Sequence, residues 1–432
     1  MMMNTPRPIP CLRWWIGGLL FLITIINYID RQTLSALAPI LEKEYHWSNT
    51  QFAMILIAFR ISYTVMQTVF GRVLDWVGTR RGMTASVAFY SIIAALTATA
   101  NSLAGFCAFR FLLAAGESAN NPGGSKAVSE WFPAKERAWA VALFDSGSSI
   151  GGAVAPFIVL GVYKWFGSWR PAFVVTASFG LVWLALWLLI YRDPEKHPRL
   201  APEELDYIRQ GRPATPENTA PPSPPAITKV LRYRQTWGLI LGRFLLDPYW
   251  FFMAEWFGLY LASKGFSLEM SVLGFWAPFL GADLGNFFGG GLSSWFINRG
   301  WAVGRARRTV LGVFGPSMLL LIPAAFSNNY WALLGLFAYA SFAYAACSTM
   351  FLTLPTDIYR SNAVGTVMGL GGTGAGVGVL LSTLLIGIIS DKVSFQPVII
   401  AASIIPCVAT LVFISLVRAP KTPDPSGIIQ DF

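Results

Sequence analysis

Ten acidic or basic residues of this 432-residue chain fall in the interior of long apolar runs, away from their ends, where an ionised side chain is costly. They are Asp30, Arg31, Arg60, Arg110, Glu117, Asp145, Arg243, Asp247, Glu255 and Asp283. Each would cost about 2.5 to 3.5 kcal/mol in contact with lipid, so together they indicate a polar interior lined by several helices. For the six other than Asp30, Arg31, Arg110 and Glu117, snorkelling near a surface or pairing that fixes helix packing is an equally good interpretation.

Four of these residues, Asp30, Arg31, Arg110 and Glu117, have a spacing that suits the binding of an anion and a proton. Arg110 and Glu117 are seven residues apart, so on a helix they share a face, about 10 Å apart along the axis. Asp30 and Arg31 are adjacent and point about 100° apart. An arginine fork binds a carboxylate through two hydrogen bonds, and a carboxyl group removed from water accepts a proton more readily. The four residues therefore predict proton-coupled binding of an organic anion.

Polar side chains near these residues offer further ligand contacts. Tyr28 lies beside Asp30 in the sequence, and Tyr63 and Gln67 lie on the next apolar run. Each is a candidate for contacts with a hydroxyl-rich ligand. Plain hydrogen bonding between helices is an equally good interpretation of all three.

The composition determines which elements position these residues. Hydrophobic residues make up 54% of the chain and charged residues 12%, against about 25% charged in a soluble domain. A membrane span needs about 20 mainly apolar residues. Twelve such runs are present, at residues 14–37, 51–73, 82–100, 103–125, 138–162, 170–191, 236–262, 271–297, 308–326, 329–354, 362–389 and 394–418. We therefore expect an all-α membrane protein with twelve transmembrane helices, the first run being a retained span rather than a cleaved signal peptide.

The basic balance of the chain follows from its expected topology. Lys and Arg total 32 against 22 Asp and Glu, a net charge of +10. The side that holds the N-terminus, alternate loops and the C-terminus carries 23 of the 32, and the opposite side carries five. By the positive-inside rule both termini are expected in the cytoplasm, and no nucleic-acid partner is needed to explain the charge.

The longest break between runs divides the chain in two. Residues 192–235 open with a charged stretch and continue into a proline-rich one, as in a solvated linker. We therefore expect a six-helix bundle in residues 1–191, a cytoplasmic linker, and a second six-helix bundle in residues 236–432. An internal repeat supports this division, because GRVLDWVGTRR at Gly71–Arg81 is partly echoed by GLSSWFINRG at Gly291–Gly300. Two pseudo-symmetric halves are a transporter layout.

The sequence argues against an enzyme and against a resident cofactor. The two histidines, His46 and His197, lie outside the apolar runs, and the four cysteines have no metal-binding spacing. Gly369, Gly371 and Gly374 form a GxGxxG pattern, but it lies within an apolar run and follows no strand, which argues against a nucleotide. We expect no metal, no cofactor and protons as the coupling ion.

Several motifs match a known family. GRVLDWVGTRR resembles the signature loop of the major facilitator superfamily. The resemblance narrows to its anion:cation symporter family through NYIDR at Asn27–Arg31, SYTVMQ at Ser62–Gln67, RFLLAAGES at Arg110–Ser118 and SEWFPAKER at Ser129–Arg137. RFLLDPYW at Arg243–Trp250 and ADLG at Ala282–Gly285 look closest to the hexuronate branch.

The resemblance implies symport of a sugar-acid monoanion with protons across the bacterial inner membrane by alternating access. In that family the proton sites fall on Asp30 and Glu117. The substrate carboxylate falls on Arg31, and Arg110 couples substrate and proton occupancy. A hexuronate such as galacturonate or glucuronate is the expected cargo, and a monomer is the expected state in the bilayer. Alternatives are an aldonate, glucarate or other carboxylate as cargo, anion exchange, or a transporter-like sensor.

Further family positions extend the expected binding site. Contacts with sugar hydroxyls fall on Tyr28 and Tyr63. The galactonate-type glutamine of the fifth span aligns with Ser148, and the asparagine of the eleventh span aligns with Thr373. Glu255 is charged where related sequences usually are not, so the second half of the site is expected to suit another ligand.

A separate group of charges lies in the signature loop. Asp75 with Arg72, Arg80 and Arg81 is expected to latch the cytoplasmic side during the transport cycle. The simpler alternative is that these residues anchor the membrane topology.

Overall fold

The computed structural model describes residues 7–209, 223–266, 274, 276–418 and 427–430. The proline-rich part of the predicted linker at 210–222 and the beginning of the predicted span at 271–297 lie outside these residues. Within the described part, secondary structure is helical apart from one isolated β-bridge, between Tyr359 and Ile429. The expected all-α class is confirmed.

The chain forms two compact units. Unit 1 comprises Met1–Pro224 and Ser361–Gly369, and unit 2 comprises Pro225–Arg360 and Leu370–Phe432. The division falls within the predicted linker, and a nine-residue segment of the eleventh predicted span belongs to unit 1. The assignment of residues 192–235 as a cytoplasmic linker stays a prediction.

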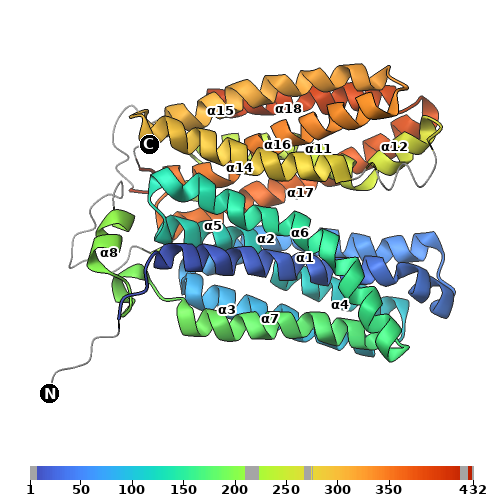
Figure 1. Cartoon of the computed structure of the whole chain (residues 1–432), viewed down its shortest axis with the longest axis horizontal. Helices are drawn as coiled ribbons and strands as arrows, with labels where there is room; N and C mark the ends of the chain where they lie inside the picture. Colours follow the sequence, from blue (N-terminus) through green and yellow to red (C-terminus); the bar gives the residue numbers. More distant parts are fainter. Residues whose placement is uncertain (1–6, 210–222, 267–273, 275, 419–426, 431–432) are drawn as a thin grey trace. The chain divides into compact units, whose positions relative to one another are not determined.

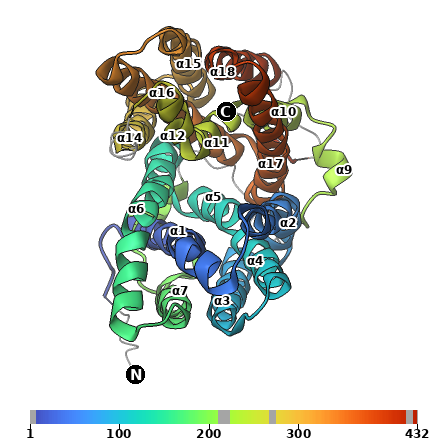
Figure 2. The same cartoon turned by 90° about the vertical axis from the view of Figure 1, so that its right-hand side faces the viewer.

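The helices of unit 1 run through the blue and green part of the chain in Figure 1. They are α1 (Leu12–Tyr45), α2 (Asn49–Val77), α3 (Thr79–Leu96), η1 (Thr97–Thr99), α4 (Leu103–Glu117), α5 (Asn120–Trp131), α6 (Ala134–Phe166), α7 (Arg170–Ile190), η2 (Pro194–Lys196) and α8 (Pro202–Arg209). Within this unit α1 packs on α6 and α7, α2 on α4, and α3 on α7 (Figure 2).

The helices of unit 2 follow in the same way. They are α9 (Ile227–Val230), α10 (Arg234–Leu246), α11 (Pro248–Glu255), α12 (Phe257–Ser263), α14 (Trp276–Asn298), α15 (Val303–Ser317), η3 (Met318–Ala325), α16 (Tyr330–Ile358) and α18 (Gln396–Leu416). Helix α17 (Ser361–Lys392) begins in unit 1 and continues in unit 2. Within unit 2, α14 packs on α16 and α10 packs on α18.

Nine helices of the described part are long and apolar enough to cross a membrane. The other three predicted runs are also helical: α4 continues into α5, α10 into α11 and α12, and the third run contains the glycine-rich α14. All twelve predicted runs therefore contain helix, as expected for a twelve-span membrane protein.

Proline causes two of the helix breaks. Pro122 has no N–H to donate to the carbonyl of Ser118, so α4 ends at Glu117 and α5 begins at Asn120. Pro248 likewise stands at the start of α11, and α10 ends at Leu246, with Asp247 between the two helices. The first break places the carboxyl group of Glu117 at a helix end.

Glycine pairs fix two close helix contacts. A Cβ on Gly147 or Gly151 of α6 would collide with the carbonyl of Phe21 or Ile25 of α1. In unit 2, a Cβ on Gly374 or Gly378 of α17 would collide with the backbone of α10, at Ile240 and Phe244. Both pairs have a spacing of four residues, which keeps the two glycines on one helix face.

The short helix α8 fixes the start of α1. The Glu204 carboxylate accepts hydrogen bonds from the backbone N–H groups of Leu12 (3.1 Å) and Arg13 (3.2 Å). The Arg13 guanidinium pairs with both Glu204 and Glu136, each at 2.7 Å. An acidic side chain at the N-terminus of a helix satisfies free N–H groups and complements the helix dipole. Helix α1, which carries Asp30 and Arg31, is thus held at one end.

Candidate functional site

A buried ion pair joins α1 and α4 in unit 1. Arg31 Nε donates to Glu117 Oε2 at 2.7 Å. The Glu117 side chain has no exposed surface, whereas 19% of the Arg31 side chain is exposed. The arginine is therefore the partner that a ligand can reach.

Aromatic rings surround the Arg31 guanidinium. Its central carbon lies 4.4 Å from the ring centroid of Tyr63, 5.0 Å from that of Tyr28 and 5.4 Å from that of Phe59. The rings of Phe59 and Tyr63 are stacked, 5.8 Å apart. Cations are attracted to ring faces at these distances. The rings hold the guanidinium in place without neutralising its charge.

Phe59 was not singled out from the sequence. It precedes Tyr63 by four residues on α2, so the two rings lie on the same helix face. That spacing beside a polar tyrosine was a signal in the sequence.

The side chain of Arg110, on α4, contacts the backbone of Arg31. Arg110 Nη2 donates to the carbonyl oxygen of Arg31 at 3.1 Å, and the Arg110 guanidinium lies 5.9 Å from the Phe59 ring. Arg110 is buried. Its charge interacts with those of Glu117, Asp30 and Arg31, so all four residues lie in one cluster.

The carboxyl groups of Asp30 and Glu117 have oxygen atoms that make no close hydrogen bond within the part of the chain that the structure describes. Asp30 is 3% exposed, and its carboxylate oxygens make no close hydrogen bond among the described residues, although the Thr176 side chain of α7 acts on them. Glu117 uses Oε2 for Arg31, and its Oε1 likewise makes no such bond. The amide of the neighbouring Asn27, fully buried on α1, also makes no close hydrogen bond in this part of the chain, and it acts on the Glu117 carboxylate. The region therefore offers several buried oxygens that can accept a proton.

The remaining predicted contacts divide between the two units. Ser148 of α6 lies within hydrogen-bonding reach of the Tyr28 hydroxyl. Gln67 is buried on α2, where its Oε1 has no partner among the described residues. Thr373 lies on the part of α17 that belongs to unit 2, and its role as a ligand contact stays a prediction.

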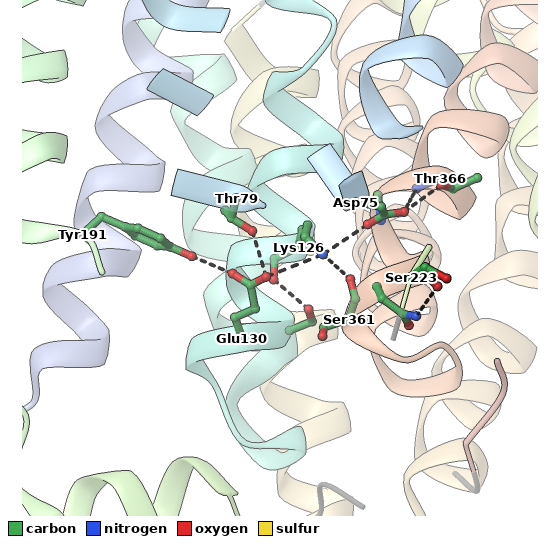
Figure 3. A network of polar contacts seen from close by, with 11 residues as sticks. Asp75, Thr79, Lys126, Glu130, Tyr191, Ser223, Ser361 and Thr366 are labelled. Carbon is green, nitrogen blue, oxygen red and sulfur yellow. Dashed lines mark hydrogen bonds and ion pairs between the residues drawn. The ribbon is translucent and has the colours of Figure 1, made fainter. Parts of the chain in front are cut away.

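A second polar network of unit 1 centres on Asp75 at the end of α2 (Figure 3). Asp75 Oδ1 accepts from the backbone N–H of Gly365 (3.0 Å), and Oδ2 accepts from both the N–H and the hydroxyl of Thr366 (2.6 and 2.7 Å). The cation on Asp75 is Lys126 of α5, with Nζ 3.1 Å from Oδ1. Lys126 also donates to the carbonyl of Ser361. Asp75 and Lys126 together hold the first turns of α17.

The network continues along α5 to α7. Lys126 Nζ lies 3.6 Å from Glu130 Oε1, which also accepts from the Thr79 hydroxyl at 2.8 Å. The other carboxylate oxygen of Glu130 accepts from the Tyr191 hydroxyl at 2.7 Å. Figure 3 shows Glu130 between Tyr191 and Lys126.

Two of the three arginines expected to act with Asp75 have other partners in the structure. Arg72 donates to the carbonyl of Pro224 (3.3 Å), Arg80 donates to that of Leu188 (2.8 Å), and Arg81 is exposed. Their part in a latch stays a prediction. Lys126 was missed from the sequence, although a lysine in the small-residue run NNPGGSKAV was a visible signal.

Two further ion pairs lie within unit 2, between Arg243 and Asp247 and between Arg307 and Asp357. Arg243 pairs with Asp247 at 2.8 Å, one turn apart, which agrees with the interpretation that these charges fix packing. Arg307, fully buried, pairs with Asp357 at 3.1 Å and donates to the Ser293 hydroxyl at 2.8 Å.

Aromatic residues form a cluster in unit 2 that we call the aromatic cluster: Tyr249, Trp250 and Tyr344. The Trp250 and Tyr344 rings are stacked, 5.8 Å apart with an interplanar angle of 8°. The Tyr249 and Tyr344 rings lie 5.4 Å apart, and the Tyr249 hydroxyl is 3.1 Å from Ser341 Oγ.

Comparisons with known proteins show what the chain is similar to. The sequence profile of the Major Facilitator Superfamily matches residues 20–321 and 300–430. The hexuronate transporter of Escherichia coli (strain K12) is 36% identical over 415 residues, 94% of each chain. The galacturonate transporter of Dickeya chrysanthemi is 39% identical over 280 residues, covering 65% of this chain and 81% of that one.

A solved structure shows the same fold. The proton:xylose symporter bound to 6-bromo-6-deoxy-D-glucose superposes with a TM-score of 0.72 at 12% identity, over 94% of this chain and 96% of that one. The profile covers residues 20–430, which include Arg31 and Glu117, and the hexuronate transporter matches 94% of the chain. The protein belongs to the Major Facilitator Superfamily.

Proposed function

We propose that the protein is a proton-coupled symporter that imports a hexuronate, galacturonate or glucuronate, across the bacterial inner membrane. The observation that carries this proposal is the Arg31–Glu117 ion pair, in which the Arg31 guanidinium also contacts the aromatic rings of Tyr28, Phe59 and Tyr63. A partly exposed arginine held by a buried carboxylate can exchange that carboxylate for the carboxylate of a ligand. The relatives named for hexuronate and galacturonate transport support the choice of cargo.

Coupling follows from competition for Arg31. While Glu117 is ionised, it holds the Arg31 fork. A proton on Glu117 removes the charge that attracts the guanidinium, so Arg31 can bind the substrate carboxylate bidentately. Loss of the proton restores the internal pair and releases the substrate. Asp30 supplies a second site for a proton, and Arg110 stabilises the cluster through its contact with the Arg31 backbone.

Alternating access between two six-helix bundles, residues 1–191 and 236–432, would move this site from one side of the membrane to the other. Both termini lie in the cytoplasm in this proposal, and the monomer is the working unit. Asp75, with Lys126, would hold α17 in one phase of the cycle, and Arg72, Arg80 and Arg81 would assist on the same side.

Uptake by proteoliposomes tests the proposal. The purified protein is given labelled galacturonate, glucuronate, galactonate, gluconate and glucarate under an imposed inward proton gradient. We expect accumulation of a hexuronate above its external concentration, and collapse of that accumulation by a protonophore. Preferential accumulation of an aldonate or glucarate would mean that this acid, rather than a hexuronate, is the transported substrate. Exchange without gradient-driven accumulation, or binding without movement, would replace symport by exchange or sensing.

A further inference from the structure

Tyr90 of α3 is a buried residue that neither the sequence motifs nor the proposed cycle uses. It is 1% exposed, and its hydroxyl has no hydrogen-bond partner among the described residues. Its position depends on Gly116 of α4, because a Cβ there would lie 2.7 Å from the Cβ of Tyr90. Gly116 directly precedes Glu117, so the tyrosine packs against α4 at the residue next to the buried carboxylate.

The charged groups around the Tyr90 hydroxyl come from α1 and α4. Asp30, Arg31 and Glu117 all act on it electrostatically, and Arg110 acts on both carboxyl groups. The tyrosine itself comes from a third helix. It therefore lies where the fields of the two proposed proton sites meet.

These mutually interacting side chains carry hydrogen-bonding atoms that the fold leaves unused. The Tyr90 hydroxyl, both oxygens of Asp30 and Oε1 of Glu117 are all buried and make no close hydrogen bond in the described part of the chain. The other polar side chains that act on the two carboxyl groups are Thr176 on Asp30 and Asn27 on Glu117. A hydroxyl can donate to one acceptor while it accepts from another donor. The Tyr90 phenol is thus able to link two carboxyl groups in a single chain of hydrogen bonds.

We infer that Tyr90 relays a proton between Asp30 and Glu117 during transport, an inference that rests on the proposed proton coupling. In the step, the O–H bond of protonated Asp30 breaks as a new O–H bond forms on the Tyr90 oxygen. The original phenol O–H bond breaks as one forms on Glu117 Oε1. The phenol ends neutral, Asp30 ends ionised, Glu117 ends protonated and no electrons are transferred.

Packing alone does not explain the hydroxyl. A buried hydroxyl without a partner is unfavourable, and phenylalanine would fill the same space without that penalty. Tyr90→Phe should therefore fold as well as the natural protein. A loss of coupling in this variant would not reflect a damaged fold.

The test compares Tyr90→Phe with Ser91→Ala in proteoliposomes. Ser91 is the next residue of α3; its buried hydroxyl also lacks a partner among the described residues and packs against Gly180 of α7, where a Cβ would collide with it. Two rates are measured for each protein: accumulation of labelled galacturonate driven by a proton gradient, and exchange of labelled for unlabelled galacturonate without a gradient.

For Tyr90→Phe we expect at least a tenfold loss of gradient-driven accumulation, with exchange within twofold of the natural protein. Ser91→Ala should keep both rates. Full accumulation by Tyr90→Phe, or an equal loss of both rates, would overturn the relay. If the natural protein itself exchanges but does not accumulate, the proposed symport fails instead, so the two failures are distinguishable.

Discussion

Two helix pairs of the molecule share a glycine spacing but carry different chemistry at the positions that follow. Gly147 and Gly151 fit against the α1 backbone at Phe21 and Ile25, and Gly374 and Gly378 fit against the α10 backbone at Ile240 and Phe244. Nine and ten residues after Phe21 are Asp30 and Arg31; nine and ten after Ile240 are Tyr249 and Trp250.

The partner helices correspond in the same way. In unit 1 the Ser62 hydroxyl donates to the carbonyl of Phe111 on α4, and in unit 2 Gly281 packs against the carbonyl of Ala338 on α16. Six residues after Phe111 is Glu117, and six after Ala338 is Tyr344. The Arg31–Glu117 ion pair therefore corresponds to the stacked rings of Trp250 and Tyr344.

This difference shows how one repeated scaffold divides its work. The glycine contacts serve packing and are kept in both units. Unit 1 places groups able to gain or lose a proton at the corresponding positions, whereas unit 2 places aromatic rings there. We therefore propose that proton coupling lies in unit 1 and that the aromatic cluster has a packing role.

The largest expected effect comes from removing the titratable group of unit 1. Glu117→Gln retains an oxygen that can accept from Arg31 but does not bind a proton. Gradient-driven accumulation of galacturonate should fall to the level of protein-free liposomes, while exchange continues. Tyr344→Phe changes the corresponding position of unit 2 and should accumulate within twofold of the natural protein. Equal losses of accumulation in both variants would contradict the assignment of proton coupling to unit 1 alone.

Arg31→Lys should produce the next largest effect, on affinity. Lysine keeps the positive charge but loses the fork that binds a carboxylate through two hydrogen bonds. Losing one charge-assisted hydrogen bond, about 1.5 to 3 kcal/mol, corresponds to a rise in Kd of about 10- to 150-fold. Isothermal titration with galacturonate measures it. An unchanged Kd would mean that the substrate carboxylate docks away from Arg31.

The glycine contacts should respond alike in the two units. Gly151→Ala and Gly378→Ala each place a Cβ against a backbone carbonyl, so each should cost about 1 to 3 kcal/mol of stability. Gly152→Ala and Gly335→Ala are controls, because a Cβ there would meet no atom within 4 Å. Thermal unfolding in detergent measures the loss as a lower Tm. A lower Tm in only one of the variants Gly151→Ala and Gly378→Ala would contradict the idea that the glycine contacts serve the same packing role in both units.

The smallest effect is expected at the unit 2 counterpart of Asp30. Tyr249→Phe removes the hydroxyl that bonds to Ser341 and should cost about 1 kcal/mol of stability. Because the ring remains, the accumulation ratio at equal amounts of folded protein should not change. A lower ratio with an unchanged Tm would give unit 2 a part in coupling.

Much of this arrangement could be predicted from the sequence. Apolar runs indicated the helices because a span needs about 20 apolar residues, and charges within such runs indicated the Arg31–Glu117 cluster. The spacing of Arg110 and Glu117 placed both on one helix face. The family motifs then supplied a role for each charge.

Contacts between distant segments could not be predicted in this way. Lys126 meets both Asp75 and Ser361, which are far from it in the chain, and no periodicity shows such a contact. Tyr90 looked like an ordinary aromatic residue of an apolar helix. Its neighbours follow from Gly116, whose missing side chain brings α3 close to Glu117.

Proton movement driven by substrate tests the central claim most directly. Proteoliposomes that contain a pH-sensitive dye, with no imposed gradient, receive galacturonate on the outside while uptake of a labelled portion is followed in parallel. Symport through the Arg31–Glu117 cluster predicts that the lumen acidifies as substrate enters, and that the Glu117→Gln variant shows no acidification. Entry of labelled galacturonate into liposomes of the natural protein without any change of internal pH would contradict the account.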